Sequence, residues 1–209
     1  MSKSNNSITT EQDSEYFTIN SQPLSYVHDV YLYDIGAPRE FAELIALLNN
    51  VGENDVVRFF INSGGGDLIT GMQILNAMET CIGTIITILD GDAASMGGII
   101  FLAGHNLTVY DHSLLMLHNF SLGMQGKSQD FVNYHKGIKD VYDGMVTKYV
   151  SRVLSEEEIT NMNKGEDIYI GTVELRERLA NYAQTLEEKI DESEEQQDMG
   201  GEVHSTESE

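Results

Sequence analysis

The most regular feature of the chain is an alternation of short apolar runs with longer amphipathic segments. Residues 56–61 and 84–89 are apolar almost throughout, a pattern typical of strands covered on both faces. Residues 68–78 place Leu, Ile and Met at helical spacing, and residues 95–103 and 107–117 continue with a short helix and further extended segments. This order of strands and helices predicts an α/β fold with a mainly parallel sheet and right-handed crossovers.

A long helix is predicted over residues 128–154. Its apolar residues, Phe131, Tyr142 and Tyr149 among them, wrap more than one face. So broad an apolar surface is unusual on a helix that lies alone in water. We therefore expect this helix to protrude from the domain and to pack in part against another subunit.

Length and charge indicate how the chain is divided. Its 209 residues are enough for one domain with a dedicated core. Residues 1–22 are rich in Ser, Asn and Thr and are expected to form a flexible leader or axial loop, followed by a folded domain over residues 23–186. Residues 187–209 hold ten acidic residues against the single Lys189, so we expect a disordered acidic tail there.

Composition also excludes some classes of partner and indicates the cellular compartment. The net charge of −22 argues against a nucleic-acid partner, because phosphate binding needs clustered Lys and Arg. The chain has no apolar stretch approaching the ~18 residues of a membrane span and no signal-peptide pattern at its N-terminus. Cys81 is the only cysteine, and its setting favours a small buried hydrophobe. These features predict a cytoplasmic protein without membrane contact.

Three segments carry candidate chemistry. Gly64–Gly66 form a turn between a predicted strand and helix, where backbone amides can converge, although any sharp turn would use glycine. Ser95 opens a predicted helix among Ala and Gly residues, and alone it would be read as an ordinary N-cap. His118 ends an apolar strand at the carboxyl edge of the sheet, where open parallel sheets keep their sites. Together they predict a serine nucleophile, its histidine base and main-chain donors for an oxyanion.

Neither a metal nor a nucleotide cofactor is expected. The glycine turn contains no Lys and no Lys-Ser/Thr pair follows it, as a nucleotide-binding loop would require. The six histidines show no metal-ligand spacing.

The three segments resemble a known family in their order and approximate spacing. Residues 60–66, 91–97 and 116–118 are similar to the signature segments of the Clp protease proteolytic subunit (ClpP), a serine peptidase family of the ClpP/crotonase fold. The resemblance extends from about Tyr31 to Asn181. It implies a fold of repeated β-β-α units with the long helix lying between rings.

The resemblance also implies a role for each candidate residue. Ser95 would be the nucleophile and His118 the base, with the oxyanion hole formed by the amides of Gly66 and Met96. The glycine turn and the residues just past His118 would hold the substrate as an added β-strand, with Gly65, Gly66 and Leu68 as further binding candidates. Members of the family form two stacked heptameric rings around a chamber. Ring-shaped AAA+ ATP-dependent unfoldases deliver unfolded polypeptides to that chamber.

The sequence departs from the family pattern at three places. Residues 63–66 read Ser-Gly-Gly-Gly where the family usually has Ser-Pro-Gly-Gly, and Phe120 stands where the family has proline. Counting back from Tyr169, which matches the family's aromatic residue after its aspartate, puts Asn163 at the third triad position. Asp167 is the nearest carboxylate and the candidate substitute.

Two alternatives to an active serine peptidase therefore stay open. Replacing the triad aspartate by asparagine costs about 10⁴ in rate in a chymotrypsin-type triad, so a weak or inactive structural subunit of a mixed assembly is one alternative. The other is a crotonase-like acyl-CoA hydratase or isomerase, which would work through carboxylates and would not need the serine and histidine pair.

Overall fold

The computed structural model describes residues 12–13, 18–19, 25–123 and 125–200. Near the N-terminus, the two-residue strands β1 (Gln12–Asp13) and β2 (Thr18–Ile19) pair antiparallel. Most of the leader predicted over residues 1–22 and the end of the predicted tail, residues 201–209, lie outside the described residues.

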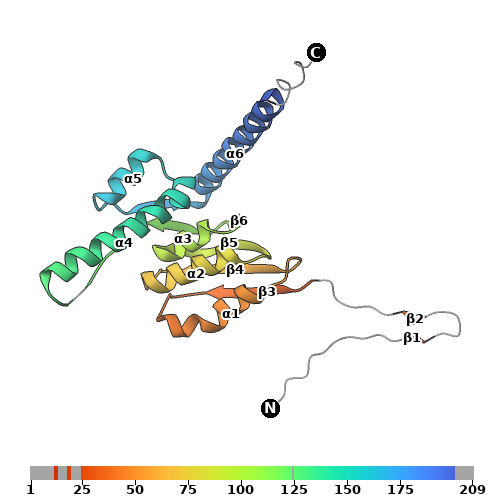
Figure 1. Ribbon diagram of the computed structural model, residues 1–209, viewed down its shortest axis with the longest axis horizontal. Helices are drawn as coiled ribbons and strands as arrows, with labels where there is room; N and C mark the ends of the chain where they lie inside the picture. Colours follow the sequence, from red (N-terminus) through yellow and green to blue (C-terminus); the bar gives the residue numbers. More distant parts are fainter. Residues whose placement is uncertain (1–11, 14–17, 20–24, 124, 201–209) are drawn as a thin grey trace, which may run out of the picture.

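A six-stranded sheet forms the centre of the fold (Figure 1). Its strands are, in chain order, β3 (Val27–Leu32), β4 (Val56–Ser63), β5 (Thr84–Ala94), β6 (Asn106–Val109), β7 (Leu114–Leu117) and β8 (Ile168–Gly171). The spatial order is β3-β4-β5-β7-β8, and β6 also pairs with β5. Every pair is parallel except β7 with β8. The predicted α/β fold with a mainly parallel sheet is confirmed.

Strand β5 changes its partner along its length. Ile86–Leu89 pair with β6, whereas Asp92–Ala94 pair with β7. Between the two halves, Gly91 has a φ of 123°, which a residue with a Cβ adopts only with strain. The last residues of β5 therefore lie beside β7, and the carboxyl ends of the two strands meet.

Six helices and two short 3-10 turns complete the described part of the chain. They are α1 (Ala42–Asn50), α2 (Leu68–Thr80), α3 (Met96–Leu102), α4 (Ser128–Lys148), α5 (Glu156–Asn163) and α6 (Thr172–Gly200), with η1 (Pro38–Phe41) and η2 (Val150–Arg152). Polar caps explain two of the starts: Asp67 accepts a bond from the Thr70 amide at α2, and Ser155 and Glu158 form a capping box at α5. Within the described residues, none of these helices has the length and apolar character that a membrane span requires.

The core combines the sheet with the apolar sides of the helices. Phe59 and Ile61 of β4 and Ile85 and Leu89 of β5 are fully buried. Helix α3 is buried along its whole length, as its uniformly apolar sequence requires. Cys81 is a free, buried cysteine, which confirms the prediction made for it. The start of α3, where Ser95 lies, is therefore held rigidly by the core.

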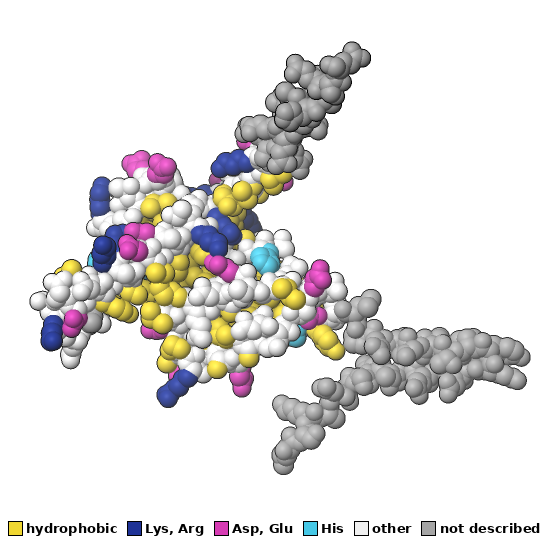
Figure 2. Space-filling view, viewed as in Figure 1, with side chains coloured by type: hydrophobic (Ala, Val, Ile, Leu, Met, Phe, Trp, Pro, Cys, Tyr) yellow, Lys and Arg dark blue, Asp and Glu magenta, His cyan; other side chains and the backbone are white. Residues whose placement is uncertain are grey.

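Helix α4 protrudes from the body of the molecule (Figure 1). It ends at Lys148 and the turn η2 follows, so the predicted helix over residues 128–154 is two elements rather than one. Several of its large apolar side chains are 41–57% exposed, namely Phe131, Val132, Tyr134 and Val141. Figure 2 shows hydrophobic side chains gathered where α4 meets the body.

The acidic C-terminal segment differs from the expectation. Helix α6 runs through Gly200, so the prediction of a disordered tail is wrong for residues 187–200. Glu, Gln and Lys are good helix formers, and bonds between side chains four residues apart, such as Gln184 Nε2 to Glu188 Oε1 at 3.0 Å, support the helix. The prediction of a disordered tail rested on the high charge of this segment and did not consider its helix propensity.

Candidate active site

Ser95 lies in the sharp turn between β5 and α3. Its φ of 56° and ψ of −123° make it the only non-glycine residue with positive φ among the described residues. Its amide donates to the carbonyl oxygen of Met116 at 2.9 Å, which ties the turn to β7. A strained strand-to-helix turn of this kind exposes a serine hydroxyl at the edge of a sheet in α/β hydrolases.

The amide of Met96 is available at the start of α3. The first N–H groups of a helix have no partner within the helix, and the side chain of Ser95 does not cap this one. The first bond across the start of α3 runs from the Ile99 amide to the Ser95 carbonyl at 3.2 Å. Within the described part of the chain the Met96 N–H has no hydrogen-bond partner, so it can bind a ligand beside Ser95.

Gly65 packs directly against the serine turn. A Cβ at this position would lie 2.7 Å from Ser95 Cβ and 2.8 Å from the Ala94 carbonyl oxygen, and the φ of Gly65 is +94°. Only glycine fits there without displacing the turn. The Gly65 amide already donates to Ser63 Oγ at 3.1 Å, and its carbonyl accepts from the Ile35 amide at 2.9 Å. Gly65 thus supports Ser95 but has no free donor for an oxyanion.

Gly66 has a free amide in the same loop. It forms a parallel bridge with Ile35, which uses its N–H on Gly65 and its carbonyl on Asp67. In such a bridge the N–H of the middle residue points away from the neighbouring segment. Among the described residues, no partner is recorded for the Gly66 N–H. The amides of Gly66 and Met96 are therefore two available donors beside Ser95.

His118 follows the last residue of β7 and is half-buried. The buried side chains of Leu115 and Leu117 anchor this strand. From α4, the hydroxyl of Tyr142 donates to the His118 carbonyl oxygen at 2.6 Å. Burial, and to a smaller extent the charge of Asp143, raises the pKa of Tyr142 to about 12, so its hydroxyl stays protonated and remains a donor.

Ser95 and His118 line one cavity of about 540 Å³. Its walls come from α2, α3, α4 and the segment after β7, and its apolar lining includes Leu68, Ile69, Met96, Ile99, Phe120 and Ile138. In the described part of the chain, no hydrogen bond links Ser95 Oγ to the imidazole. The fold therefore brings the predicted nucleophile and base to the same cavity without joining them.

Asp167 lies opposite His118 when the strand register is extended. Strands β7 and β8 pair antiparallel, with Leu117 opposite Ile168. One residue further, His118 comes opposite Asp167. Directly opposed residues of an antiparallel pair have Cα atoms ~4.5–5.5 Å apart and side chains on the same face. If the pairing continues by one residue, the side chains of Asp167 and His118 lie on the same face of the sheet.

Asn163 occupies a different position. It is the last residue of α5, and its carbonyl oxygen accepts a bond from Asn119 Nδ2 at 3.2 Å. Asn163 contacts the histidine segment through its backbone. Among the described residues, the side chains of Asn163 and Asp167 are both exposed and neither is hydrogen-bonded to the imidazole of His118.

The sequence interpretation did not predict that α4 lines the cavity, although it expected the residues just past His118 to hold the substrate. Tyr134, Ile138 and Tyr142 line the cavity, as do Ser121–Gly123. The three α4 residues recur every four positions, so they lie on one face of the helix, and the sequence shows this spacing. We expected part of that helix to pack against another subunit, and the structure shows that another part of its apolar surface faces the cavity.

Groups for carboxylate or metal chemistry are scarce in this cavity. The described residues contain no cluster of three or more His, Cys, Asp or Glu that could hold a metal ion. Asp67 is the one carboxylate among the described lining residues, and it already accepts bonds from the amide and hydroxyl of Thr70 at 2.7 and 2.8 Å. The arrangement instead offers a hydroxyl, an imidazole and two main-chain donors.

A profile of the Clp protease family matches residues 34–177, the segment that holds the serine turn, the glycine loop and the cavity. The chain belongs to the Clp protease family. This membership confirms the resemblance seen in the three signature segments.

Three members of the Clp protease family illustrate the degree of similarity. The ATP-dependent Clp protease proteolytic subunit of Pinus contorta is 28% identical over 136 residues, 64% of this chain and 66% of that protein. The subunit of Pinus thunbergii is 27% identical over 136 residues, 64% of this chain and 69% of its own length. ATP-dependent Clp protease proteolytic subunit 3 of Rhodococcus jostii (strain RHA1) is 33% identical over 99 residues, which are 46% of this chain and 48% of that protein. The chain thus spans about two thirds of the pine proteins and half of the bacterial one.

Proposed function

We propose that this chain is a serine endopeptidase subunit that hydrolyses peptide bonds of unfolded polypeptides inside an oligomeric chamber. The observation that carries the proposal is the strained turn at Ser95. It lines the same cavity as His118 and lies beside the free amides of Gly66 and Met96. A positive φ at a serine is costly, and such strain is characteristic of residues with a functional role.

The reaction follows from these groups. Ser95 Oγ attacks the carbonyl carbon of the scissile peptide bond while His118 accepts the hydroxyl proton. The amides of Gly66 and Met96 donate to the oxyanion of the tetrahedral intermediate. The C–N bond then breaks, the imidazolium gives its proton to the leaving amine, and the acyl group remains on Ser95. A water molecule deprotonated by His118 attacks the acyl-enzyme, which releases the carboxylic acid and restores the hydroxyl.

The missing bond between Ser95 Oγ and the imidazole is compatible with this scheme. Catalytic hydrogen bonds in structures without substrate are often long and shorten only when substrate binds. The two residues follow the carboxyl ends of the adjacent strands β5 and β7, which supports a rotation of side chains as the step that brings them together.

Asp167 is the better candidate for the residue that orients His118. A carboxylate there would fix the imidazole tautomer and stabilise the imidazolium. The register of β7 and β8 supports Asp167, whereas Asn163 interacts through its backbone carbonyl. The assignment of Asn163, which rested on counting residues, is therefore the weaker of the two.

The lining of the cavity supports a preference for apolar side chains at the cleavage site. Leu68, Ile69 and Ile138 offer apolar contacts, and the one lining carboxylate among the described residues, Asp67, is occupied by Thr70. Burying a charged substrate side chain there without a partner would be unfavourable. The exposed edge of the glycine loop suits an extended peptide added as a strand.

Assembly is part of the proposal. The exposed apolar side chains of α4 support a role for this helix between subunits, in a homo-oligomer of stacked heptameric rings. We further propose that an AAA+ ATP-dependent unfoldase supplies the substrate and that the complex works in the cytoplasm. The ring arrangement and the unfoldase rest on family membership, whereas the compartment rests on the composition of the chain.

Hydrolysis of fluorogenic peptides by the purified chain tests the function. Ser95→Ala should abolish hydrolysis, and Asp167→Asn should lower kcat by up to ~10⁴. Asn163→Ala, a control at the end of α5 four residues before Asp167, should change kcat by less than a few-fold. Peptides with Leu before the scissile bond should be cleaved faster than peptides with Glu there.

The alternatives predict other outcomes. A crotonase-like hydratase or isomerase would keep its activity on acyl-CoA after Ser95→Ala. An inactive structural subunit would form rings without cleaving any peptide of the panel. A larger loss from Asn163→Ala than from Asp167→Asn would reverse the assignment of the third residue.

A further inference from the structure

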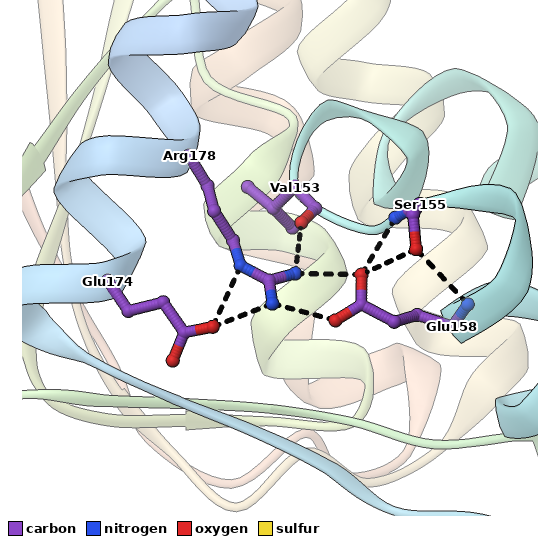
Figure 3. A network of polar contacts seen from close by, with 5 residues as sticks. All are labelled: Val153, Ser155, Glu158, Glu174 and Arg178. Atoms are coloured by element: carbon purple, nitrogen blue, oxygen red, sulfur yellow. Dashed lines mark hydrogen bonds and ion pairs between the residues drawn. The ribbon is translucent and has the colours of Figure 1, made fainter.

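The guanidinium of Arg178 joins α6 to the beginning of α5 (Figure 3). Nη1 and Nη2 of Arg178 donate to Oε2 and Oε1 of Glu158 at 2.9 and 2.7 Å. Nε and Nη2 donate to Glu174 Oε1 at 3.1 and 2.6 Å, and Nη1 donates to the Val153 carbonyl oxygen at 2.7 Å. These contacts use all five N–H groups of the guanidinium. The arginine is only 24% exposed and is held on several sides.

The carboxylate that Arg178 binds also begins α5. The amide and hydroxyl of Ser155 donate to Glu158 Oε2 at 2.8 and 2.9 Å, and Ser155 Oγ accepts from the Glu158 amide at 3.3 Å. This is a capping box, which fixes the first turn of a helix. Arg178 therefore connects the start of α5 to α6, an element that follows β8 in the chain.

The other end of α5 leads into the candidate active site. Its last residue, Asn163, accepts the bond from Asn119, the neighbour of His118. A tight turn follows, in which the Glu166 amide donates to the Asn161 carbonyl oxygen at 3.1 Å. The next residue is Asp167, opposite His118 in the extended register of β7 and β8. The position of α5 thus sets where Asp167 lies.

We propose that Arg178 is a positioning residue for the imidazole of His118. Through Glu158 it holds α5, and α5 with its C-terminal turn keeps Asp167 opposite His118. The inference rests on the proposed function, because it takes His118 as the base and Asp167 as its orienting carboxylate. Arg178 itself is not among the described residues that line the cavity, so it acts on geometry rather than on substrate.

Kinetics of Arg178 variants provide the first test. Arg178→Gln should lower kcat roughly 10- to 100-fold with KM unchanged, because a displacement of about 1 Å in a catalytic site can cost ~10² in rate. Arg178→Lys should fall between wild type and Arg178→Gln, since lysine keeps the charge but loses the planar fork. Arg176→Gln is the matched control: Arg176 lies on the same helix and pairs with Asp111 instead, so its loss should leave kcat unchanged.

A double-mutant cycle separates positioning from general stability. In an Asp167→Asn background, Arg178→Gln should have no further effect on kcat, because the group that it positions is already removed. A merely structural arginine would lower kcat by the same factor in both backgrounds. That result would overturn the proposal.

Hydrogen exchange of the whole chain tests whether Arg178 holds α5 in place, and it does so without relying on activity. Arg178→Gln should speed amide exchange in residues 156–168 and leave β4 and β5 unchanged. Unchanged exchange in residues 156–168, or faster exchange throughout, would overturn the proposal. If the wild-type chain cleaves no peptide, the proposed function fails, and the exchange result alone decides whether Arg178 holds α5.

Discussion

The backbone of Ser95 is held in its strained conformation from several directions. Its amide is bonded to Met116, Gly65 packs against its side chain, and the buried helix α3 begins at the next residue. A non-glycine residue at positive φ of this kind costs of order 1–3 kcal/mol and persists only where its surroundings fix it. The neighbours of Ser95 thus stabilise a turn that the serine alone would avoid.

Two adjacent glycines test this account of the serine turn. Gly65→Ala should lower the free energy of unfolding by about 1–3 kcal/mol and abolish hydrolysis, because the new Cβ would meet Ser95 Cβ at 2.7 Å. Gly64→Ala is the control, since its nearest contact would be Asp34 Oδ1 at 3.9 Å and its φ is not positive. Urea unfolding and peptide hydrolysis measure both effects. Equal behaviour of the two variants would contradict the account.

The residues of the site were predictable to different degrees. Ser95, Gly66 and His118 each follow the end of a strand in a local motif, so the sequence indicates both their place and their chemistry. Asp167 comes opposite His118 only when the antiparallel register of β7 and β8, which lie some fifty residues apart in the chain, is continued by one residue. No local pattern shows that register, and counting residues selected Asn163 instead.

Among the elements, α5 depends on an electrostatic contact with α6. The bonds from Arg178, followed by those from Ser155, lower the pKa of Glu158 to about 2. A carboxylate with a lower pKa in the folded than in the unfolded chain stabilises the fold above the unfolded value of ~4.3. This contribution is lost as the pH falls from ~4.3 through about 2.

Acid unfolding of a Glu158 variant measures this contribution. Glu158→Gln should remove about 1 kcal/mol of stability at neutral pH and flatten the fall in stability between pH ~4.3 and ~2. Glu157→Gln, from the same helical turn, should keep the wild-type profile, because no contact of its side chain is recorded among the described residues. Melting temperatures between pH 2 and 6 provide the comparison. A wild-type profile in Glu158→Gln would show that the contact has no net effect on stability.

Some helices and strands were predictable because a local pattern in the sequence marks where they lie. The apolar runs of residues 56–61 and 84–89 predicted β4 and β5. The end of α4 at Lys148 was not predicted. At that point Lys148 and the hydroxyl of Tyr149 both contact Glu79 at the end of α2. This is a tertiary contact, and the helical pattern of residues 128–154 does not show it.

For the whole molecule, the protruding helix α4 is the feature that most requires a partner. A Val132→Glu substitution tests this, because it puts a charge on a side chain that is 57% exposed in the single chain. If α4 packs between subunits, wild type should be several-fold larger than one chain in light scattering, and Val132→Glu should be smaller.

A matched control places the same charge elsewhere on α4. Asn133 is exposed and polar, and its Oδ1 accepts a bond from Gln129 Nε2 at 3.0 Å, so Asn133→Glu should remain assembled. Assembly of Val132→Glu identical to wild type would exclude this face from the interface.

Covalent labelling with an active-site fluorophosphonate tests the central claim most directly. The account predicts one adduct on the wild-type chain, located by mass spectrometry at Ser95, because the activated hydroxyl displaces fluoride from phosphorus. Labelling should disappear in Ser95→Ala and be strongly slowed in His118→Ala, with both variants still folded. A folded, assembled wild-type chain that takes up no label at Ser95, or that is labelled equally well without His118, would contradict the account.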